Sequence, residues 1–287
     1  MNIPTALQPL IEDGIVDRVL RQLKSGKEAT VYVVESGGEL RCAKVYKDAE
    51  HRGFHKLAQY QEGRRARGSR DARALNRHSK RGRQIQESQW KTVEVRALQR
   101  LGDAGVRVPR PVGVYDGVLV MELLVGDDGR PAPRLAEVEL DREHALRWHA
   151  LMIRQIIRML CAGLIHGDLS EYNVLIDSDG PVIIDLPQAV DAASNNGAFE
   201  MLARDVDNMR ETFARAAPEL LQTEYAREIW ALYRSGALQA DSALTGRYVD
   251  NDGAADVDAV LAQIEAARRE AEARQRGREE AEAAERS

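Results

Sequence analysis

The chain has 287 residues, of which 44% are hydrophobic and 30% are charged, and its formal net charge at pH 7 is −5. This length and composition fit one two-lobed domain or two small domains with ordinary apolar cores. No apolar run approaches the length that spans a bilayer, and residues 1–10 lack the basic and apolar stretches of a leader, so we expect a cytoplasmic protein with no membrane partner.

The first expected elements are a short helix and a strand hairpin. Apolar residues recur at helical intervals across residues 12–23, which predicts an amphipathic helix. Apolar and polar residues then alternate over residues 29–34, Gly37 and Gly38 provide a tight turn, and residues 40–46 supply a returning strand.

The returning strand carries a lysine on an apolar face. Lys44 shares this face with Leu40, Cys42 and Tyr46. A lone ammonium group there is costly unless it meets an anion, so Lys44 is a candidate anion-binding residue. Cys42 and Cys161, the latter in an expected buried helix, suggest neither a disulfide framework nor a zinc site, and we expect both thiols to be reduced.

The turn ahead of the first strand is a candidate phosphate-binding loop. It consists of Lys24, Ser25, Gly26 and Lys27. Backbone N–H groups of such a turn, the Ser25 hydroxyl and the Lys24 or Lys27 amine can contact phosphates. Glu28 stands where a Walker loop needs Ser or Thr, so the motif gains its meaning from its position directly before the hairpin that carries Lys44.

A basic insert and a helix come next. Residues 48–88 lose the apolar period, which predicts a mobile insert. Within it, residues 64–83 hold nine Lys or Arg residues and one acid, Asp71. The nine are Arg64, Arg65, Arg67, Arg70, Arg73, Arg77, Lys80, Arg81 and Arg83. This run could contact the phosphates of RNA, or it could be a solvated loop. Helical spacing returns at Trp90 and ends at Gly102.

The remaining expected elements form a second lobe. Residues 112–125 predict two strands, and residues 126–133 predict a linker that we take as the lobe boundary. Apolar residues at helical intervals then predict a buried helix: Leu146, Ala150, Ile153, Ile157 and Leu160. Helical patterns also fill residues 198–216 and 218–235, and the tail from about residue 254 predicts a solvated helix.

The most informative stretch spans residues 165–185. It places Asp168 in a loop, Asn173 five residues later and Asp185 at a strand end twelve residues further on. The residues between Asn173 and Asp185 predict a hairpin, which would return Asp185 to the side of Asn173. Phosphoryl transfer from a metal nucleotide needs this spacing, with Asp168 to orient and deprotonate an attacking hydroxyl and with Asn173 and Asp185 to hold the divalent ion. The alternative is a polar turn followed by an unrelated strand-end carboxylate.

The residues around this core resemble the RIO family of atypical protein kinases, and its first subfamily in particular. The resemblance rests on His-Gly-Asp-Leu-Ser-Glu-Tyr-Asn at 166–173 and Ile-Asp-Leu-Pro-Gln-Ala at 184–189. Further similar strings are Lys-Glu-Ala-Thr-Val-Tyr at 27–32, Ala-Lys-Val-Tyr-Lys at 43–47, Val-Leu-Val-Met at 118–121 and Pro-Ala-Pro at 131–133. The resemblance covers about residues 13–215. It implies a two-lobed, protein-kinase-like α+β fold with an antiparallel sheet in the N-lobe and a mainly helical C-lobe.

The resemblance and the composition together divide the chain into four expected segments. They are an N-terminal helix at 1–24, the kinase N-lobe at 25–125 with a basic flexible insert near 50–88, the kinase C-lobe at 126–250 and a charged helical tail at 251–287.

The resemblance implies a role for Lys44 and for a carboxylate partner. In kinases this lysine contacts the α and β phosphates and pairs with a helix glutamate. Glu94, on the apolar face of its helix, is the expected partner. Glu87 is a competing candidate, and Glu94 could instead lie at the surface beside a neighbour such as Lys91.

The resemblance also implies which residues surround the adenine. Met121 and the residues after it resemble the hinge, so Glu122 and Leu124 would offer backbone groups to the adenine edge. Cys42 would form part of the roof over the adenine, where kinases usually carry Ala. Asp205 matches an Asp at the start of a late helix in RIO proteins, where it could simply cap that helix.

We therefore expect a RIO-type serine/threonine kinase with ATPase activity that binds ATP with Mg²⁺ or Mn²⁺ and phosphorylates itself or a protein. The resemblance adds a link to ribosome maturation, with ribosomal RNA or a ribosome precursor as a partner of the basic insert, and Asp185 as a transient phosphoryl acceptor. Two alternatives remain: a small-molecule phosphotransferase of the aminoglycoside or choline kinase type, which also uses His-Gly-Asp, and a nucleotide-gated RNA-binding module. The strings at 27–32 and 186–189 favour the protein kinase over the small-molecule enzyme.

Overall fold

The computed structural model describes residues 3–26, 29–47 and 94–248. The chain divides into two compact units, Met1–Arg247 and Tyr248–Ser287, and the first contains every helix and strand named below. Several sequence predictions lie outside the described residues. They concern Lys27, the basic insert with its nine cationic residues, Glu87, Trp90, Lys91 and the tail beyond residue 250.

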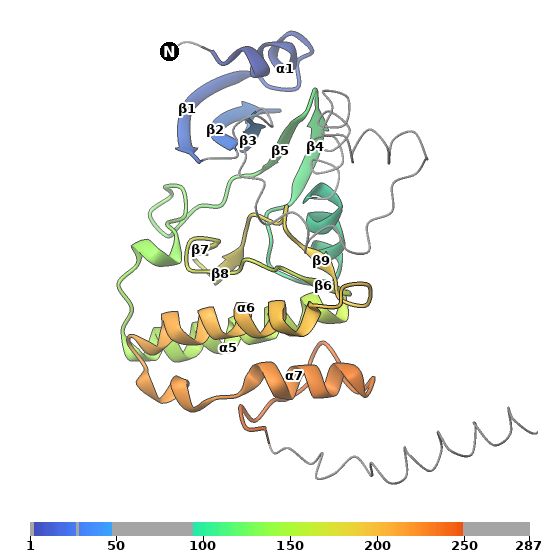
Figure 1. The fold of residues 1–287 in the computed structure, drawn as a ribbon. Helices are drawn as coiled ribbons and strands as arrows, with labels where there is room; N and C mark the ends of the chain where they lie inside the picture. The colour runs from blue at the N-terminus through green and yellow to red at the C-terminus, as the bar shows by residue number, and fades with distance from the viewer. Residues whose placement is uncertain (1–2, 27–28, 48–93, 249–287) are drawn as a thin grey trace, which may run out of the picture. The chain divides into compact units, whose positions relative to one another are not determined.

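An antiparallel sheet of five strands forms the N-terminal lobe, with the order β1-β2-β3-β5-β4 (Figure 1). The strands are β1 Arg18–Ser25, β2 Ala29–Ser36, β3 Glu39–Tyr46, β4 Pro111–Tyr115 and β5 Val118–Glu122. The β2–β3 hairpin turns at Gly37 and Gly38, whose φ angles of 61° and 78° suit glycine. The expected hairpin and the expected strand pair at 112–125 are both confirmed.

The prediction of a helix over residues 12–23 is wrong. A short helix, α1 Gln8–Glu12, precedes this stretch, and most of the stretch belongs to β1. The register of β1 against β2 shifts between Val19 and Arg21 and again between Gln22 and Lys24. Each shift interrupts the alternation of faces, so the apolar spacing imitates a helical period.

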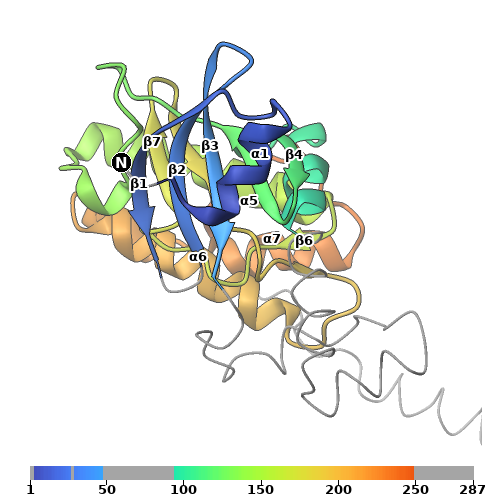
Figure 2. The same ribbon diagram turned by 90° about the horizontal axis from the view of Figure 1, so that it is seen from above.

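The core of this lobe lies between α1 and the sheet. Leu7, Leu10 and Val16 are buried there against Val34, Ala43 and Val120. Seen from above, α1 lies across strands of the sheet (Figure 2). The N-terminal segment therefore covers one face of the sheet and leaves the other face toward the second lobe.

The second lobe is mainly helical. Its helices are α5 Arg142–Cys161, α6 Ala198–Ala214 and α7 Tyr225–Arg234, with short 3₁₀ turns at Leu135–Glu137 and Pro218–Gln222. Two small strand pairs join them, β6 Leu164–Ile165 with β9 Val190–Asp191 and β7 Val174–Asp177 with β8 Gly180–Ile183. The β7–β8 pair is the hairpin expected between Asn173 and Asp185. Helices α5 and α6 lie side by side beneath the strands (Figure 1).

The buried face of α5 differs from the expected one. Ala150 is exposed and Leu146 is only half-buried, although the spacing predicts both in the core. The polar residues His149 and Gln155 are buried instead. A hydrophobic pattern cannot place polar core residues, so the predicted face is rotated from the observed one. Cys161, at the end of the helix, is also exposed and not buried.

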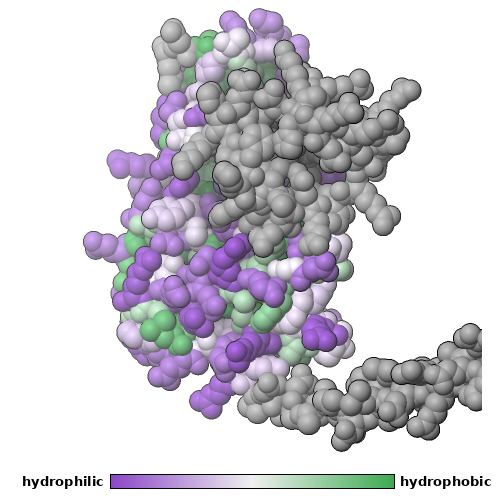
Figure 3. Space-filling view, in the orientation of Figure 1, coloured by the Kyte–Doolittle hydropathy of each residue, from purple (hydrophilic) through white to green (hydrophobic). Residues whose placement is uncertain are grey.

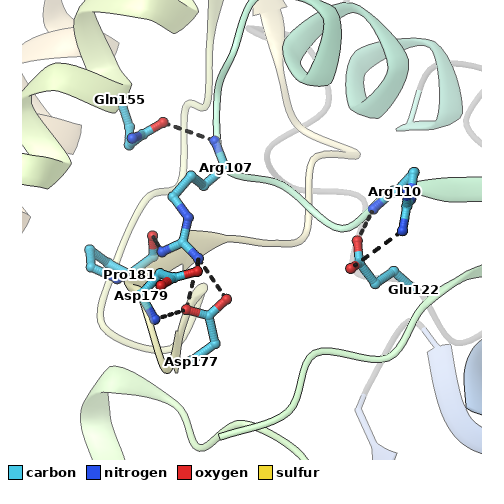
Figure 4. Close-up of polar contacts among 7 residues, drawn as sticks. All are labelled: Arg107, Arg110, Glu122, Gln155, Asp177, Asp179 and Pro181. Carbon is cyan, nitrogen blue, oxygen red and sulfur yellow. Dashed lines mark hydrogen bonds and ion pairs between the residues drawn. The ribbon is translucent and has the colours of Figure 1, made fainter.

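Residues 106–110 tie the two lobes together (Figure 4). The backbone N–H of Arg107 donates to Oε1 of Gln155 on α5 over 2.9 Å, and its carbonyl accepts from the N–H of Ile183 over 2.9 Å. Its guanidinium group donates to both carboxylate oxygens of Asp177 over 2.7 Å and to the carbonyl of Pro181 over 3.3 Å. The loop that follows the helix at 94–103 is thus fixed to the β7–β8 hairpin.

On the face shown in Figure 3, hydrophilic side chains predominate among the described residues, with small apolar patches between them. Scattered apolar patches of this kind are normal for a folded domain in water. No helix within the described ranges combines the length and apolar character needed to cross a membrane.

Candidate active site

A buried ion-pair cluster joins the two lobes at Lys44, which lies on the central strand β3 between β2 and β5. Its Nζ donates to Oε1 of Glu94 over 2.7 Å and to Oδ1 of Asp185 over 2.8 Å. The hydroxyl of Tyr46 donates to the second oxygen of Glu94 over 2.5 Å. Both Lys44 and Glu94 are buried, at 8% and 2% exposure. These four residues, Lys44, Tyr46, Glu94 and Asp185, are called the Lys44 cluster below.

The contacts within the cluster keep Lys44 and Asp185 charged. Burial lowers the pKa of Lys44, but the carboxylates of Glu94 and Asp185 outweigh burial and raise it above the ordinary range. Burial raises the pKa of Asp185, but the charge and hydrogen bond of Lys44 outweigh it and lower the pKa below the usual value. Burial and the Glu94 carboxylate raise the pKa of Tyr46, so its hydroxyl stays a donor. Glu94 is therefore the partner of Lys44, as expected, and not a surface residue.

The loop at 166–173 is held by α6. The carboxylate of Asp205 accepts from the N–H groups of Gly167 over 2.8 Å and Leu169 over 2.9 Å. On the same helix, Asn208 Nδ2 donates to the carbonyl of Leu169 over 2.8 Å, and the Arg204 guanidinium donates to the carbonyl of Gly167. Asp205 lies in the interior of α6, so the expectation that it caps a helix start is wrong. It binds the backbone of a loop instead, and sequence position alone could not distinguish the two roles.

The ends of the hairpin meet within this loop. Asn173 accepts at its backbone carbonyl from the N–H of Ile184 over 3.0 Å, as the hairpin geometry requires. Its Nδ2 donates to the carbonyl of Asp168 over 2.8 Å. His166 is buried, receives the N–H of Asp168 at Nδ1 over 3.3 Å and lies 3.1 Å from the carbonyl of Ile184 through Nε2. The structure therefore brings Asp168, Asn173 and Asp185 together as the spacing predicted.

Asn173 and Asp185 each have a side-chain oxygen that could bind a magnesium ion. Because the Asn173 nitrogen is taken by Asp168, its amide oxygen is the atom left for a ligand. The Asp185 side chain is 45% exposed, and its bond to Lys44 uses Oδ1 and not Oδ2. In the described part of the chain no group of three or more His, Cys, Asp or Glu side chains could hold a metal. Two protein oxygens supplemented by phosphate and water oxygens are, however, the usual arrangement for Mg²⁺.

Asp185 also has an uncommon backbone conformation. Its φ angle is 67°, in the left-handed region that non-glycine residues seldom occupy. Such a conformation costs roughly 1 kcal/mol or more and persists where the surroundings impose it. In this conformation the Asp185 carboxylate contacts Lys44, next to the end of the hairpin.

The candidate phosphate loop has a partner that the sequence did not single out. Lys47 Nζ donates to Ser25 Oγ over 3.1 Å and to the carbonyl of Gly26 over 2.6 Å. The N–H of Gly26 donates to the carbonyl of Ala29 over 2.8 Å, which closes the turn. Lys24 and Ser25 are exposed, and Lys27 lies outside the described residues. That Lys24, Ser25 and Gly26 contact phosphate therefore stays a prediction.

The expected hinge has the right strand geometry. Met121 pairs with Cys42 across β5 and β3, and burial raises the pKa of the Cys42 thiol to about 12, so it stays neutral. Glu122 donates its N–H to the carbonyl of Arg110 over 2.9 Å, and the carbonyl of Leu124 accepts from the N–H of Ala132 over 3.0 Å. These two bonds use the Glu122 N–H and the Leu124 carbonyl. A purine edge can pair with one acceptor and one donor, and the Glu122 carbonyl and the Leu124 N–H would be such a pair.

Sequence reasoning missed several residues around the site. Tyr46 and Lys47 are polar residues near the end of β3, and Arg134 contributes a positive charge that lowers the pKa of Asp185. Gln188 donates to Oδ2 of Asp168 over 3.5 Å. In the sequence, the Leu-Pro-Gln-Ala string indicates only a resemblance to the family. It lies near Asp168 because β6 pairs with β9, and strands of two residues are too short to be predicted from a hydrophobic pattern.

Comparison with protein families and curated proteins gives one consistent match. The family model for the RIO domain matches residues 30–226 of this chain. The RIO-type serine/threonine-protein kinase Rio1 of Haloferax volcanii is 37% identical over 212 residues, which are 73% of this chain and 68% of that protein. The serine/threonine-protein kinase RIO1 of Homo sapiens is 32% identical over 208 residues, which are 72% of this chain but only 35% of the human protein.

Solved structures resemble the fold. The Rio2 kinase from Chaetomium thermophilum, in the crystal structure of its ADP/Mg²⁺-phosphoaspartate complex, superposes with a TM-score of 0.57 at 24% identity. The superposition covers 82% of this chain and 68% of that one. A second crystal structure of the same kinase gives a TM-score of 0.55 at 22% identity, with coverage of 90% and 76%. The expected two-lobed, kinase-like α+β fold is confirmed.

Proposed function

The chain belongs to the RIO family of atypical protein kinases, and we propose that it is an ATP-dependent serine/threonine kinase with ATPase activity, using ATP and Mg²⁺. The observation that supports this most is the contact of Lys44 with both Glu94 and Asp185. In this contact the cation of one lobe lies beside the Asp185 carboxylate of the other lobe, which is the group that we propose as a metal ligand. The named Rio1 relatives support the same activity, although the match to the human protein spans a third of that protein's length.

Each residue has a role that its contacts suit. Lys44 neutralises the negative charge of the α and β phosphates, and Glu94 holds its amine in place. Asn173 and Asp185 hold Mg²⁺, which neutralises the charge of the phosphates when bound. Asp168 orients the acceptor hydroxyl and takes its proton. Glu122 and Leu124 bind the adenine edge, Cys42 and Met121 pack near the ring, and the turn at Lys24, Ser25, Gly26 and Lys27 contacts phosphate.

The proposal is tested by replacing Asp185 with Ala. Turnover of ATP in the presence of Mg²⁺ should fall to the background rate, because the metal loses a ligand. Calorimetry of ATP with Mg²⁺ should show weakened binding in the variant and clear heat in the wild type. Full turnover by Asp185→Ala, or no heat with the wild type, would contradict the assignment.

The acceptor can be identified with radiolabelled ATP. Label on the protein itself or on an added protein indicates protein kinase chemistry. Label found only on added amino alcohols indicates a small-molecule phosphotransferase instead.

The phosphoaspartate of the Chaetomium complex is a property of that kinase. For this chain we propose Asp185 as the equivalent acceptor, and hydroxylamine-sensitive label that peptide mapping locates on Asp185 would support it.

A ribosomal partner is a separate proposal that rests on the sequence. The nine Lys and Arg residues between 64 and 83, with one acid among them, match the charge pattern that binds RNA phosphates. Binding to ribosomal RNA should weaken steeply with added salt and disappear when these nine residues are neutralised. Absent or salt-independent binding would remove the proposal.

The free thiols Cys42 and Cys161 support a reducing compartment such as the cytoplasm.

A further inference from the structure

Gln188 is a polar residue beside Asp168 that the proposed chemistry does not use. Its Nε2 donates to Oδ2 of Asp168 over 3.5 Å. Its Oε1 is buried and, in the described part of the chain, has no hydrogen-bond partner. A buried acceptor without a donor destabilises the folded protein, so a polar residue kept in such a position calls for a functional explanation.

The direction of the Gln188 amide follows from Asp168. If the amide were turned over, Oε1 would face a carboxylate oxygen and the two would repel each other. The observed direction instead gives the carboxylate an N–H donor and leaves the amide oxygen unsatisfied. Within the described ranges, the polar group of Gln188 therefore serves Asp168.

The segment that carries Gln188 is rigid. Leu186 is fully buried, Ala189 is 3% exposed, and the N–H of Ala189 donates to the carbonyl of Leu186 over 3.1 Å around Pro187. The next residue, Val190 in β9, pairs with Ile165 in β6, which leads directly into the loop that carries Asp168. A donor fixed in this way can hold a neighbouring side chain in one rotamer.

We propose that Gln188 is a positioning residue that holds the Asp168 carboxylate in the orientation that meets the acceptor hydroxyl; this rests on the proposed function. The backbone of Asp168 is fixed by His166 and Asn173, but those bonds do not restrain its side-chain torsions. Among the described residues, the carboxylate receives its hydrogen bond from Gln188. A small displacement of a catalytic group slows transfer far more than it weakens nucleotide binding.

The test compares two glutamines replaced by methionine, which has a similar length but no amide. Gln188→Met should lower kcat roughly tenfold with the KM for ATP changed less than about twofold. Its thermal unfolding temperature should stay equal or rise, because the unsatisfied Oε1 is gone. Gln155→Met is the matched control, since Gln155 Oε1 accepts the N–H of Arg107. It should unfold at a lower temperature and keep the kcat of the wild type.

Gln188→Glu provides a second variant that keeps the size of the side chain. A carboxylate beside Asp168 repels it, so kcat should fall further than in Gln188→Met, by about a hundredfold. A kcat within twofold of the wild type in both variants overturns the proposal. So does a Gln188→Met variant whose loss of kcat is matched by the loss of thermal stability seen in Gln155→Met, because Gln188 would then serve packing.

A spectroscopic measurement separates this proposal from the function on which it rests. The side-chain amide resonance of Gln188 in a ¹H–¹⁵N spectrum is identified by its absence in Gln188→Met. It should shift in Asp168→Ala if the two side chains are hydrogen-bonded, and an unmoved resonance overturns the positioning role. A wild-type protein that turns over no ATP contradicts the proposed function, and this resonance then decides the role of Gln188 by itself.

Discussion

The Lys44 cluster and the loop at 166–173 each supply part of the candidate site, but they are held in place by different forces. The cluster joins the ammonium group of Lys44 to the carboxylates of Glu94 and Asp185, and so it connects both lobes. The loop is held through its backbone by Asp205, Asn208 and Arg204, which all come from α6. One region depends on charge balance, and the other depends on backbone hydrogen bonds.

This difference separates the part of the site that responds to ligand from the part that does not. A metal nucleotide adds charge to the Lys44 cluster, where Asp185 must serve both Lys44 and the metal. The backbone bonds of the loop have no such competitor, because their partners are N–H and C=O groups that keep the same charge throughout. We therefore expect ligand to rearrange the cluster and to leave the backbone of the loop unchanged, although Asn173 of the loop would bind the metal, and the predictions below test each side.

The largest effect is expected from Lys44→Met. The variant removes the cation that neutralises phosphate charge, so kcat should fall by at least about a hundredfold. It also leaves the Glu94 carboxylate buried without its counter-ion, which should reduce the free energy of unfolding by about 3 kcal/mol. Steady-state kinetics and urea denaturation measure the two losses.

The double variant Lys44→Met with Glu94→Gln is the control for charge balance. It removes both members of the buried pair, so most of the lost stability should return while kcat stays low. Stability that stays low in the double variant would mean that packing at Lys44, and not an unpaired carboxylate, caused the loss. The account of the cluster as a charge-balanced unit would then be wrong.

Much of this arrangement could be predicted from the sequence. The strings around Asp168, Asn173 and Asp185 contain their own hairpin, so short-range patterns place these residues correctly. The resemblance to kinases implies a helix carboxylate as the partner of Lys44, and the apolar face of its helix favours Glu94 for this role. Residues whose place follows from local periodicity are those that sequence reasoning recovers.

The remaining features depend on long-range pairing, which no local pattern records. The bulges in β1 disguise a strand as a helix, since the shift of register appears only when β2 is in place. The sequence position of Asp205 suggests a helix cap because its partners, Gly167 and Leu169, lie more than 35 residues away along the chain. Gln188 has no periodic context and reaches Asp168 only through the β6–β9 pair. The roles of the site residues toward nucleotide and metal stay predictions.

An intermediate effect is expected from Asp205→Asn, which tests the loop side of the comparison. The amide oxygen can accept one of the two N–H groups, but the amide nitrogen then faces the other N–H. One buried donor is left unsatisfied, so we expect a loss of about 2 kcal/mol in stability. The loosened loop should lower kcat about tenfold, with a smaller change in the KM for ATP.

Asp207→Asn on the same helix is the matched control for Asp205→Asn. Asp207 is 43% exposed and pairs with Arg210 over 3.0 Å. The Arg210 side chain is 24% exposed, and a partly exposed pair of this kind contributes at most about 1 kcal/mol, so this variant should lose less stability than Asp205→Asn and keep the turnover of the wild type. Equal losses in both variants would show that α6 is sensitive to charge in general, and Asp205 would lose its special role in holding the loop.

The smallest effect is expected from Arg107→Ala, which asks whether the two regions are coupled. The guanidinium group links the loop that follows the helix of Glu94 to Asp177 in the β7–β8 hairpin (Figure 4). The backbone bonds of Arg107 to Gln155 and Ile183 remain after the substitution. Stability should fall by about 1.5 kcal/mol, since two charge-assisted bonds are lost. Arg110→Ala removes a mostly exposed arginine whose guanidinium lies 3.8 Å from Glu122, and it should change stability by less than about 0.5 kcal/mol.

Because the surviving backbone bonds keep the hairpin in register, kcat of Arg107→Ala should stay within about threefold of the wild type. A larger fall would mean that the cluster and the loop share one rigid support, and the division between a ligand-responsive half and a fixed half would not hold.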